Sequence, residues 1–413
     1  MAFRELEIPS SGGAFDAGAL ALAAPAAKAA PAVQEAADDL AREVYCLLGI
    51  PVDAIDMAEA LRRIDAAVAA RRPFLISTPN LNFLITSGRD RPFRNSLLAS
   101  DLCPVDGMPL VWIARLIGVP QPQRVSGSDM FEALKSGANE LRVFLFGGPE
   151  GIAARAGEKL NAGSGRMRCV GSYYPGFSAV EDMASDATLD AINASGADFL
   201  AAALGAIKGQ AWLLLNHDRL RIPVRVHLGA VLNFEAGSVA RAPRAWRKLG
   251  FEWLWRIKEE PYLWRRYWSD GRALAALTVT RLLPLVALRV WRQFKPPAPL
   301  AARCVSRPGS VLLTLAGDAT SSAIAGATAA CREALVADQP VVIDVAAVRL
   351  VDARFLGLLL MLRKTLVQRG LSLHFTGLTR SFETYLRLSG LDFLLDKEVE
   401  AIHVAAIPDD CKA

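Results

Sequence analysis

The segment Leu141-Arg142-Val143-Phe144-Leu145-Phe146-Gly147-Gly148 is a mostly apolar run that ends in two glycines, and Pro149-Glu150-Gly151 follows it. An apolar run of this length bounded by glycines predicts a buried strand, and residues 152–160 carry the spacing of a helix. Free backbone N–H groups and the helix dipole converge at such a turn, so Gly147 and Gly148 can contact a phosphate. The spacing of a dinucleotide fingerprint and the Lys-Ser/Thr pair of a P-loop are both missing, so a plain tight turn remains an equal alternative.

The same alternation of strand and helix continues on both sides of this segment. Each apolar run ends in glycine or in polar residues, and stretches of helical spacing separate the runs. Repeated alternation of this kind predicts parallel strands with helices on both faces of the sheet. We therefore expect a Rossmann-like α/β domain with a mostly parallel sheet over residues 41–240. Its predicted strands are residues 74–77, 101–105, 141–146, 198–204 and 224–230, and its predicted helices include residues 57–70, 82–99 and 152–160.

The length and composition of the chain bound its class. Its 413 residues exceed what one hydrophobic core usually supports, which predicts two or three domains. Residues 1–40 are rich in Ala, Gly and Pro and are expected to form a flexible leader, because Lys28 interrupts the apolar stretch that an export signal needs. The six cysteines are scattered without a C-x-x-C pair, which predicts reduced thiols, no zinc site and a cytoplasmic protein.

Polar residues mark the predicted strand ends, where open α/β sheets build their sites. Asp106 lies in Pro104-Val105-Asp106-Gly107, and its carboxylate can take a proton from an attacking hydroxyl, although an Asp before Gly also caps turns. Thr78 and Asn80 can bond a substrate hydroxyl or can simply form a strand exit. Arg124 can bind a diphosphate in bidentate fashion or form a surface ion pair.

Six pieces of sequence follow one another over roughly residues 70–270. They are Thr78-Pro79-Asn80, Val105-Asp106-Gly107 before Val111-Trp112, Arg124 with Ser126-Gly127-Ser128-Asp129, Phe144-Leu145-Phe146-Gly147-Gly148, Gly205-Ala206 before Lys208 and Trp212, and Arg241-Ala242-Pro243-Arg244 before Leu249-Gly250-Phe251-Glu252-Trp253-Leu254. In this order the sequence resembles the WecG/TagA/CpsF glycosyltransferases. These bacterial enzymes add a sugar to a polyprenyl-diphosphate-linked acceptor at the inner membrane face.

The resemblance implies an inverting, metal-independent transfer from a UDP-sugar donor to a polyprenyl-diphosphate-linked acceptor, with no cofactor. It implies that Asp106 is the general base and that Thr78 acts beside it. No D-x-D carboxylate pair occurs, so the sequence offers no obvious ligands for a metal that would clamp the donor. The residues implied in substrate binding are Asn80, Arg124, Ser128, Gly147, Gly148, Lys208, Gln210, Asn233, Arg256, Arg265 and Arg266.

Two positions depart from the family pattern. Gly209 stands where the family has a glutamine, and a glutamine appears one place later as Gln210. Asn233 before Phe234 stands where the family has an aspartate, and an amide keeps a hydrogen bond but cannot accept a proton. Both a changed donor and a reduced activity are compatible with these departures.

Residues 241–295 hold thirteen Lys/Arg against four Asp/Glu and six of the eight tryptophans. Tryptophan interleaved with arginine suits the headgroup layer of an anionic membrane, and an ordinary helical hairpin is the alternative. We expect residues 241–296 to be a membrane-docking appendage on the inner face of the bacterial plasma membrane. No nucleic-acid reader motif accompanies the basic residues, which argues against a nucleic-acid partner.

The apolar residues 273–290 of this appendage carry Arg281, Pro284 and Arg289. A spanning helix would have to bury these cations, so we expect an interfacial helix that lies on the bilayer. The resemblance implies that arginines of the appendage complete the site on the membrane. The candidates for this role are Arg256, Arg265 and Arg266.

Pro296, Pro297 and Pro299 predict a linker to a separate module over residues 305–408. The module alternates strand and helix again and resembles a STAS domain, the fold of anti-sigma-factor antagonists and sulphate-transporter tails. The family switch is a phosphorylatable Ser after Asp at the start of the second helix, whereas this chain reads Asp352-Ala353-Arg354. We expect a phosphate-independent module for a protein partner, with Arg354 as a surface charge.

Two classes of function follow from these patterns. The first is a peripheral membrane glycosyltransferase with a fused interaction domain. The second is a noncatalytic nucleotide-sugar sensor or scaffold, which the Gly209 and Asn233 departures favour. A nicotinamide oxidoreductase would need a glycine fingerprint and an acidic ribose contact that the sequence lacks.

Overall fold

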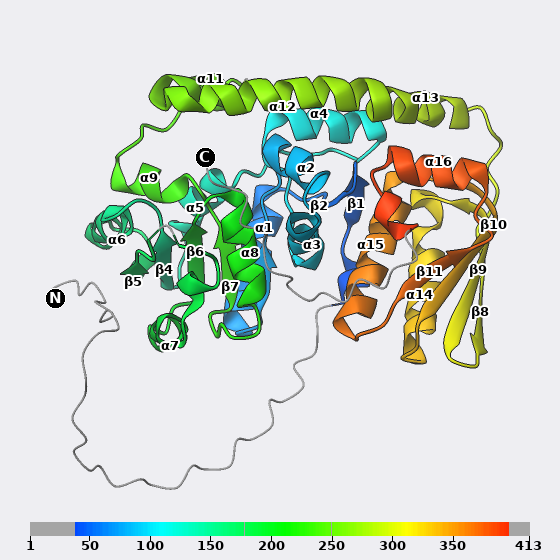
Figure 1. Cartoon of the computed structure of the whole chain (residues 1–413), viewed down its shortest axis with the longest axis horizontal. Helices are drawn as coiled ribbons and strands as arrows, with labels where there is room; N and C mark the ends of the chain where they lie inside the picture. Colours follow the sequence, from blue (N-terminus) through cyan, green and yellow to red (C-terminus); the bar gives the residue numbers. More distant parts are fainter. Residues whose placement is uncertain (1–37, 177, 249, 396–413) are drawn as a thin grey trace, which may run out of the picture.

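The computed structural model describes residues 38–176, 178–248 and 250–395, so the predicted leader up to residue 37 lies outside the described residues. Two α/β units lie at the two ends of an elongated molecule, and a long helix runs along one side of both (Figure 1). We call residues 38–240 the N-terminal domain, residues 241–296 the appendage and residues 301–395 the C-terminal domain. The last residues assigned to the leader are ordered, because η1 (Asp39–Ala41) begins there.

The N-terminal domain contains a five-stranded parallel sheet in the order β3-β7-β6-β4-β5. The chain passes from β4 to its neighbour β5 and returns to the other side of β4 as β6, so the loops after β4 and β6 diverge. The C-terminal ends of all five strands share one edge because the strands are parallel. The strands are β3 (Phe74–Ile76), β4 (Leu141–Gly147), β5 (Met167–Tyr173), β6 (Phe199–Ala203) and β7 (Val224–His227).

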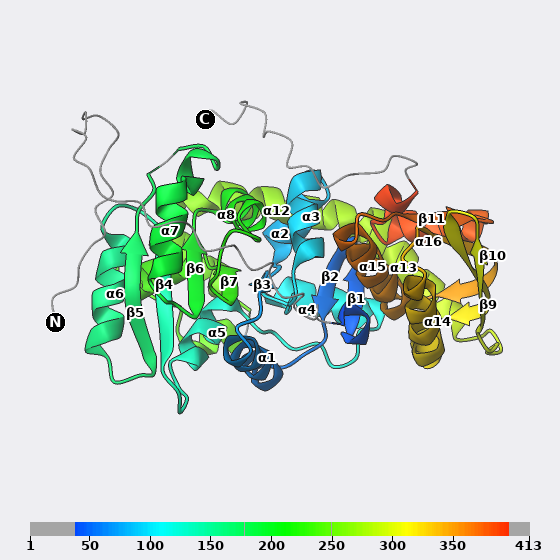
Figure 2. The ribbon, with the colours of Figure 1, turned by 90° about the horizontal axis from the view of Figure 1, so that it is seen from below.

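Helices cover both faces of this sheet, which confirms the predicted fold class (Figure 2). Ile64, Phe131 and Leu160 are buried against one face, and Leu189 and Trp212 against the other. Burial of each such side chain stabilises the fold by about 1.5–3 kcal/mol. The first face is covered by α1 (Met57–Ala69), α5 (Gly127–Leu134), α6 (Ile152–Ala162) and α9 (Val231–Ala236), and the second by η2 (Asp182–Ala184), α7 (Asp186–Ala194) and α8 (Ala206–Leu215).

Two predicted elements differ from the structure. The helix predicted over residues 82–99 is two helices, α2 (Leu81–Ser87) and α3 (Arg91–Ala99), because Asp90 caps a new helix by accepting the Phe93 N–H. The strand predicted over residues 101–105 makes only single parallel bridges, one of them between Leu102 and Ile76. Pro104 lies in this segment and has no N–H for a longer ladder.

The appendage is helical, and its last three elements form one continuous helix. They are α12 (Trp264–Leu277), the π-helical turn η4 (Thr278–Leu282) and α13 (Leu283–Arg292). The π turn ends just before Pro284, which has no N–H for a regular helical bond and therefore widens the preceding turn. The shorter elements before it are α10 (Arg244–Lys248), α11 (Glu252–Glu259) and η3 (Pro261–Leu263).

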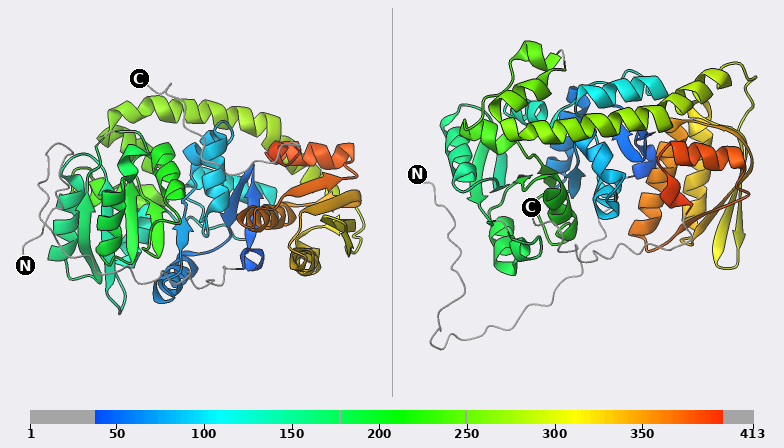
Figure 3. Two further views of the ribbon diagram at one scale, coloured as in Figure 1. Left: turned by 60° about the horizontal axis from the view of Figure 1, so that its bottom comes forward. Right: turned by 45° about the horizontal axis from the view of Figure 1, so that its top comes forward.

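By length and composition alone, the 32 residues Pro261–Arg292 are enough to cross a membrane. The same helix nevertheless packs along both domains (Figure 3). It contacts α2 and α4 (Met108–Ile117) of the N-terminal domain and α16 (Arg380–Leu388) of the C-terminal domain. Its position therefore bridges the two domains.

The C-terminal domain has a four-stranded sheet in the order β11-β10-β9-β8, in which β8 is antiparallel and the other pairs are parallel. Its helices α14 and α15 bury a row of apolar side chains in the core. This smaller α/β unit confirms the second domain that the sequence predicted. Its elements are β8 (Ala301–Arg307), β9 (Ser310–Ala319), η5 (Ser321–Ala323), α14 (Ile324–Val336), β10 (Val341–Val351), α15 (Ala353–Gln368), β11 (Leu373–Thr376), α16 and η6 (Asp392–Leu394).

The two domains share a core. The hairpin of β1 (Val44–Leu47) and β2 (Ile50–Asp53) belongs to the N-terminal domain but packs against α15. A Cβ atom on Gly357 of α15 would lie 2.0 Å from the carbonyl oxygen of Val44, so only glycine permits this approach. One continuous hydrophobic cluster contains residues of both domains. The two domains therefore bury apolar side chains against each other in one common core.

Arg354 lies in this interface, and the prediction that it is a surface charge is wrong. Its guanidinium is buried and donates to the carbonyl oxygens of Val44 and Arg42, each at 3.1 Å. The ring of Tyr45 lies under the cation, 5.8 Å from its central carbon. The long-range approach of the hairpin to α15 buries this side chain, and its local sequence gives no sign of that approach.

Candidate active site

Backbone hydrogen bonds join the three polar motifs of the N-terminal domain. The N–H of Asp106 donates to the carbonyl oxygen of Pro79 at 2.9 Å, which fixes the loop before α4 against the exit of β3. The N–H of Val125 donates to the carbonyl oxygen of Val105 at 2.8 Å. Segments about twenty residues apart in sequence thus meet at the C-terminal edge of the sheet.

Gly127 lies between the two predicted catalytic side chains. Its N–H donates to Oδ2 of Asp106 at 3.4 Å. A Cβ atom at Gly127 would lie 3.2 Å from Oγ1 of Thr78 and 2.6 Å from Cδ2 of Leu228, so a side chain would not fit without displacing its neighbours. Thr78 and Asp106 therefore border the same small space, as the motif spacing predicted.

The partly buried carboxyl group of Asp106 has an unusual proton affinity. Burial raises the pKa of Asp106 to about 7, since it removes water from the charged form. The cation of Arg124 opposes this rise in the pKa, whereas the nearby carboxylates of Glu252 and Asp129 add to it. A carboxylate with a pKa near 7 is a much stronger base than an ordinary Asp and is still ionised in part at neutral pH.

Arg124 is held between two carboxylates rather than lying free on the surface. Its Nη1 lies 2.8 Å from Oδ2 of Asp129, and its Nη2 lies 2.6 Å from Oε2 of Glu252 at the start of α11. Glu252 belongs to the appendage, so this pair ties the appendage to the N-terminal domain. The guanidinium bridges two different carboxylates, which fixes its plane.

Two further arginines of the appendage, Arg241 and Arg247, contact the same carboxylate. Both form ion pairs with Oδ1 of Asp129, and Arg241 also lies 3.3 Å from the hydroxyl of Ser128. Burial alone would raise the pKa of Asp129, but a hydrogen bond from Ser126 and the three arginines keep that pKa below its usual value. We call Arg124, Arg241 and Arg247 the arginine cluster.

Sequence reasoning did not assign a role to Arg241 or Arg247. The Nε atoms of both are buried and have no hydrogen-bond partner among the described residues. Unused buried donors beside Asp106, which is only partly ionised at neutral pH, suit a ligand that carries several anionic oxygens. The sequence signal for these two arginines is the Arg241-Ala242-Pro243-Arg244 motif and the basic residues that follow it. In the sequence this motif supports the family resemblance, and it does not indicate a contact with Asp129.

The predicted glycines lie on the same edge of the sheet as Asp106. Gly147 ends β4 and Gly148 follows it, with φ angles of 92° and 79° that favour glycine. The N–H of Gly148 donates to the carbonyl oxygen of Ala203 at 2.7 Å, which ties this turn to the end of β6. Asn233 lies on α9 after β7, next in sequence to Leu232, which packs near Gly148. These residues follow the inner strands of the sheet, whereas Thr78 follows the edge strand β3.

The structure explains why Gly209 departs from the family pattern. A Cβ atom at Gly209 would lie 2.1 Å from Cδ2 of His227, so the imidazole occupies the space that a longer side chain would need. Burial lowers the pKa of His227 to about 4, so its ring is neutral at pH 7. At this place in the core, the imidazole of His227 therefore fills the space that a glutamine side chain at position 209 would occupy.

Gln210 and Lys208, both on α8, lie away from the arginine cluster. The side chain of Gln210 is fully buried and accepts a hydrogen bond from Ser77 at 3.1 Å, which differs from the predicted contact with substrate. Lys208 is exposed, and its Nζ lies 3.1 Å from the carbonyl oxygen of Ser178 in the loop after β5. The glutamine stands one place later than in the family pattern, and at this position its side chain lies in the core.

Four other predicted residues lie around the site. Asn80 caps α2 by accepting the N–H of Phe83 at 3.2 Å, so its side chain serves the fold. Arg256 pairs with Glu260 one turn along α11, and its Nε has no partner among the described residues. Arg265 and Arg266 are exposed on α12 and lie over the rings of Trp264 and Tyr267.

Metal-ligating residues do not gather in the described part of the chain, where no three His, Cys, Asp or Glu side chains could hold an ion together. Its cysteines, Cys46, Cys103, Cys169, Cys304 and Cys331, are free thiols, and Cys411 lies outside the described residues.

A base with a pKa near 7 beside an arginine cluster, at the carboxyl edge of a parallel sheet, is suited to transfer of a group from a diphosphate donor. The fold and this site define a glycosyltransferase domain that carries a second, interaction-type domain. Residues 45–286, more than half of the chain, match the model described as Glycosyl transferase WecG/TagA/CpsF family, and the chain belongs to this family. Residues 304–396 match the model described as Mlab, STAS domain.

Membership of this family makes the protein a glycosyltransferase of cell-surface polysaccharide synthesis and implies a nucleotide-sugar donor and a lipid-linked acceptor. The family match begins inside the β1–β2 hairpin and ends in α13. The appendage therefore lies largely within the glycosyltransferase match, although the sequence patterns treated it as a separate segment.

Proposed function

We propose that the protein transfers a sugar from a UDP-sugar to a polyprenyl-diphosphate-linked acceptor with inversion, and that Asp106 is the general base. The observation that carries this proposal is the position of Asp106, whose pKa is near 7, between Thr78 and the arginine cluster. The proposal extends to a metal-independent reaction, in which the arginine cluster supplies the positive charge that a metal ion would otherwise bring to the diphosphate.

The proposed reaction is one displacement. Asp106 takes the proton of the acceptor hydroxyl, and the oxygen attacks the anomeric carbon from the side opposite the donor diphosphate. The bond between the anomeric carbon and the diphosphate oxygen breaks, and the electron pair leaves with UDP. Arg124, Arg241 and Arg247 stabilise the charge that develops on the departing diphosphate.

We also propose that the reaction takes place on an anionic membrane surface, on the inner face of the plasma membrane. Large apolar side chains of α4 and of the appendage are exposed, and cations lie among them. The long helix packs on both domains, so crossing a bilayer would require it to leave them, which supports an interfacial position. The exposed side chains are Trp112, Leu116, Trp246, Phe251, Trp253, Leu254, Trp264, Trp268, Val279, Leu283, Val290 and Trp291.

The test uses purified full-length protein, a polyprenyl-diphosphate-linked acceptor in anionic vesicles and a panel of UDP-sugars. Transfer that depends on one donor and disappears in Asp106→Asn supports the proposal. The matched control is Asp190→Asn on the exposed surface of α7, which should keep its activity. Donor binding without any transfer by the native protein would instead favour the noncatalytic sensor.

A further inference from the structure

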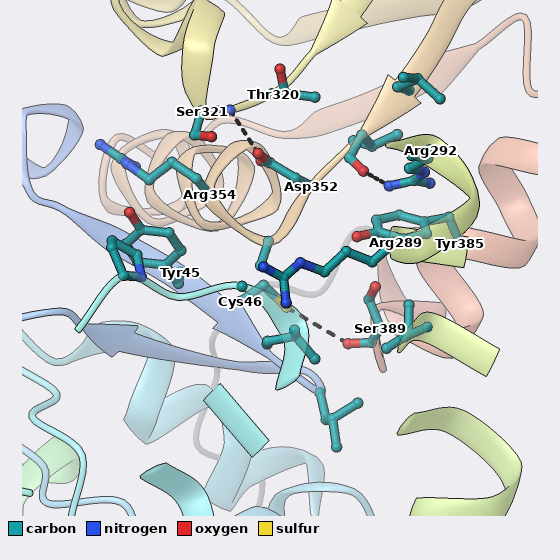
Figure 4. Close-up of a pocket in the computed structure, with 18 of the residues that line it drawn as sticks. Tyr45, Cys46, Arg289, Arg292, Thr320, Ser321, Asp352, Arg354, Tyr385 and Ser389 are labelled. Atoms are coloured by element: carbon teal, nitrogen blue, oxygen red, sulfur yellow. Dashed lines mark hydrogen bonds between the residues drawn. The ribbon is translucent and has the colours of Figure 1, made fainter. Parts of the chain in front are cut away.

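A cavity of about 410 Å³ lies where the N-terminal domain, the appendage and the STAS domain meet (Figure 4). Its walls come from the β1–β2 hairpin and the end of α4, from α13, and from the first turn of α15 together with α16. The cavity is built from parts of the chain more than 300 residues apart, and it lies apart from Asp106 and the arginine cluster, none of which lines it. Its volume falls in the range of small-molecule sites.

The charged residues of the cavity are mostly arginines. Arg289, Arg292 and Arg354 line it together with one carboxylate, that of Asp352. Both oxygens of Asp352 are used by the backbone, since they accept the N–H of Phe355 at 2.9 Å and the N–H of Ser321 at 2.7 Å. Asp352 keeps its negative charge, but three arginines against one carboxylate leave the walls with a net positive charge.

Much of the hydrogen-bonding capacity of Arg289 and Arg292 is unused within the described residues. Nη1 of Arg289 donates to the carbonyl oxygens of Arg115 and Leu116 at the end of α4, at 3.3 and 2.9 Å. Nη1 of Arg292 donates to the carbonyl oxygen of Val351, and its guanidinium lies 4.2 Å from the ring centre of Tyr385. A guanidinium has five N–H donors, so these contacts position the two forks without saturating them.

The buried cation of Arg354 adds to the positive electrostatic potential of the cavity. Burial lowers the pKa of Arg354, and the nearby acidic groups offset this effect only in part. An anion in the cavity would relieve this cost, because it adds the opposite charge close to the buried guanidinium.

The rest of the wall is apolar or aromatic. Leu48, Ile117 and Leu285 line it. The rings of Tyr45 and Tyr385 line it too, from opposite sides (Figure 4). A bare ion would leave most of this volume unfilled. The walls therefore suit a molecule with an anionic head and an apolar body.

We propose that this cavity is a binding site for a phosphate-bearing molecule with an apolar body, whose phosphate is held by Arg289 and Arg292. One guanidinium fork can pair with two oxygens of a carboxylate or of a phosphate, but two forks together call for more oxygens than a single carboxylate has, which favours phosphate. The phosphate belongs either to a soluble ester or to a lipid, since Val290 and Trp291 of the same helix are exposed beside the cavity. A bound molecule would join α13 to α15 and α16.

Isothermal titration calorimetry with the full-length protein distinguishes the two sources. Phenyl phosphate is the soluble probe, and dihexanoyl phosphatidic acid below its micellar concentration is the lipid probe. We expect saturable binding of at least one of them at one site per chain. The double variant Arg289→Gln/Arg292→Gln should weaken that binding roughly tenfold or more, because each charge-assisted hydrogen bond contributes more than an uncharged one.

The matched control is Arg303→Gln/Arg307→Gln, which removes the same charge from the exposed strand β8 and should bind as the native protein does. A second variant, Ser321→Trp, keeps every arginine and fills the cavity, and it should also abolish binding. If the arginine variant does not fold, binding by Ser321→Trp alone tests whether the cavity is the binding site. The proposal is overturned if neither probe saturates, if both double variants weaken binding equally, or if Ser321→Trp binds normally.

Discussion

The ammonium group of Lys364, on α15 of the STAS domain, lies 2.7 Å from Oδ1 of Asp101, next to strand β3 of the glycosyltransferase domain. The other oxygen of Asp101 accepts the N–H of Leu75 in β3 at 2.8 Å. Lys364 also lies 3.0 Å from Asp39, and its side chain is 2% exposed. A buried cation of one domain thus fixes the strand that leads to Thr78, three residues after Leu75.

Lys364→Ala should destabilise the whole chain. The substitution leaves the carboxylate of Asp101 without its ion-pair partner and that of Asp39 with Arg42 alone, and breaking a buried pair in this way costs about 3–5 kcal/mol. Urea denaturation at pH 7 measures the loss of free energy of unfolding. The matched control is Arg332→Ala, because its pair with Asp38 is half exposed on both sides, and a change of at most about 1 kcal/mol is expected. Equal effects of the two variants would contradict the role of Lys364 as the buried link.

The transfer activity should rise with pH through about 7, the pKa of Asp106. Asp106 accepts a proton only when it is ionised, so the acid limb of the kcat/KM profile reports its pKa in the free enzyme. Arg124 lowers this pKa, and Arg124→Gln should therefore move the limb to higher pH in addition to reducing activity. A pH–rate profile between 5 and 9 tests this, and a limb near pH 4 would show that Asp106 is not the titrating base.

Asp106→Asn should abolish transfer and stabilise the fold. The pKa of Asp106 is raised on folding, so the native chain loses stability as pH rises from about 4 to about 7 and the buried carboxyl group ionises. The amide never ionises, and the advantage of the variant should therefore grow from pH 4 to pH 8. Thermal unfolding at these two pH values measures it. A variant that is less stable than the native chain at pH 8 would be inconsistent with a desolvated carboxylate.

Gly209→Ala should destabilise the protein by about 1–3 kcal/mol, the usual cost of overpacking a core. The added Cβ would lie 2.1 Å from the imidazole of His227. His227→Ala should remove most of this penalty in the double variant, which a double-mutant cycle on the denaturation midpoint detects. The control is Gly326→Ala in α14, where a Cβ would meet nothing within 4 Å and a small gain in stability is expected.

Trp264→Ala/Trp268→Ala should weaken binding to anionic vesicles roughly tenfold or more. Each indole buries on the order of 150–250 Å² when it enters an interface, at about 25 cal/mol per Å². Both side chains are more than half exposed in the structure, at 53% and 66%. Vesicle sedimentation measures the change, and Val336→Ser on the exposed surface of α14 is the control. Unchanged binding of the tryptophan variant would place the membrane contact elsewhere.

Much of the fold followed from local patterns. Apolar runs that end in glycine or in polar residues predicted β3, β4, β6 and β7, and the helices predicted over residues 57–70 and 152–160 are present, because burial on two sheet faces leaves a periodic signal. Strand β5 (Met167–Tyr173) was not among the predicted strands. The split of residues 82–99 into two helices depends on the N-cap at Asp90. The spacing of the apolar residues does not indicate this cap. Residues 101–105 form only single bridges, to Asp53 and Ile76, and this pairing depends on the tertiary structure.

The site was predicted in part. Thr78, Asp106, Arg124 and Ser128 meet around Gly127, as the motifs implied. Arg241 and Arg247 were not predicted, because their contact with Asp129 joins residues more than 110 positions apart. Gln210 lies in the core because its neighbour Gly209 makes room for His227, and no local pattern indicates that exchange.

The sequence by itself determined the family, the two α/β units and the aspartate at the strand end, since each of these depends on residues close together in the chain. Only the tertiary structure decided that the STAS domain docks on the β1–β2 hairpin, that Arg354 and Lys364 are buried there, and that three arginines gather around the cavity behind α13. These features depend on the close approach of two backbones at Gly357 and on ion pairs between the domains. Both join residues that are far apart in the chain, so no single stretch of sequence predicts them.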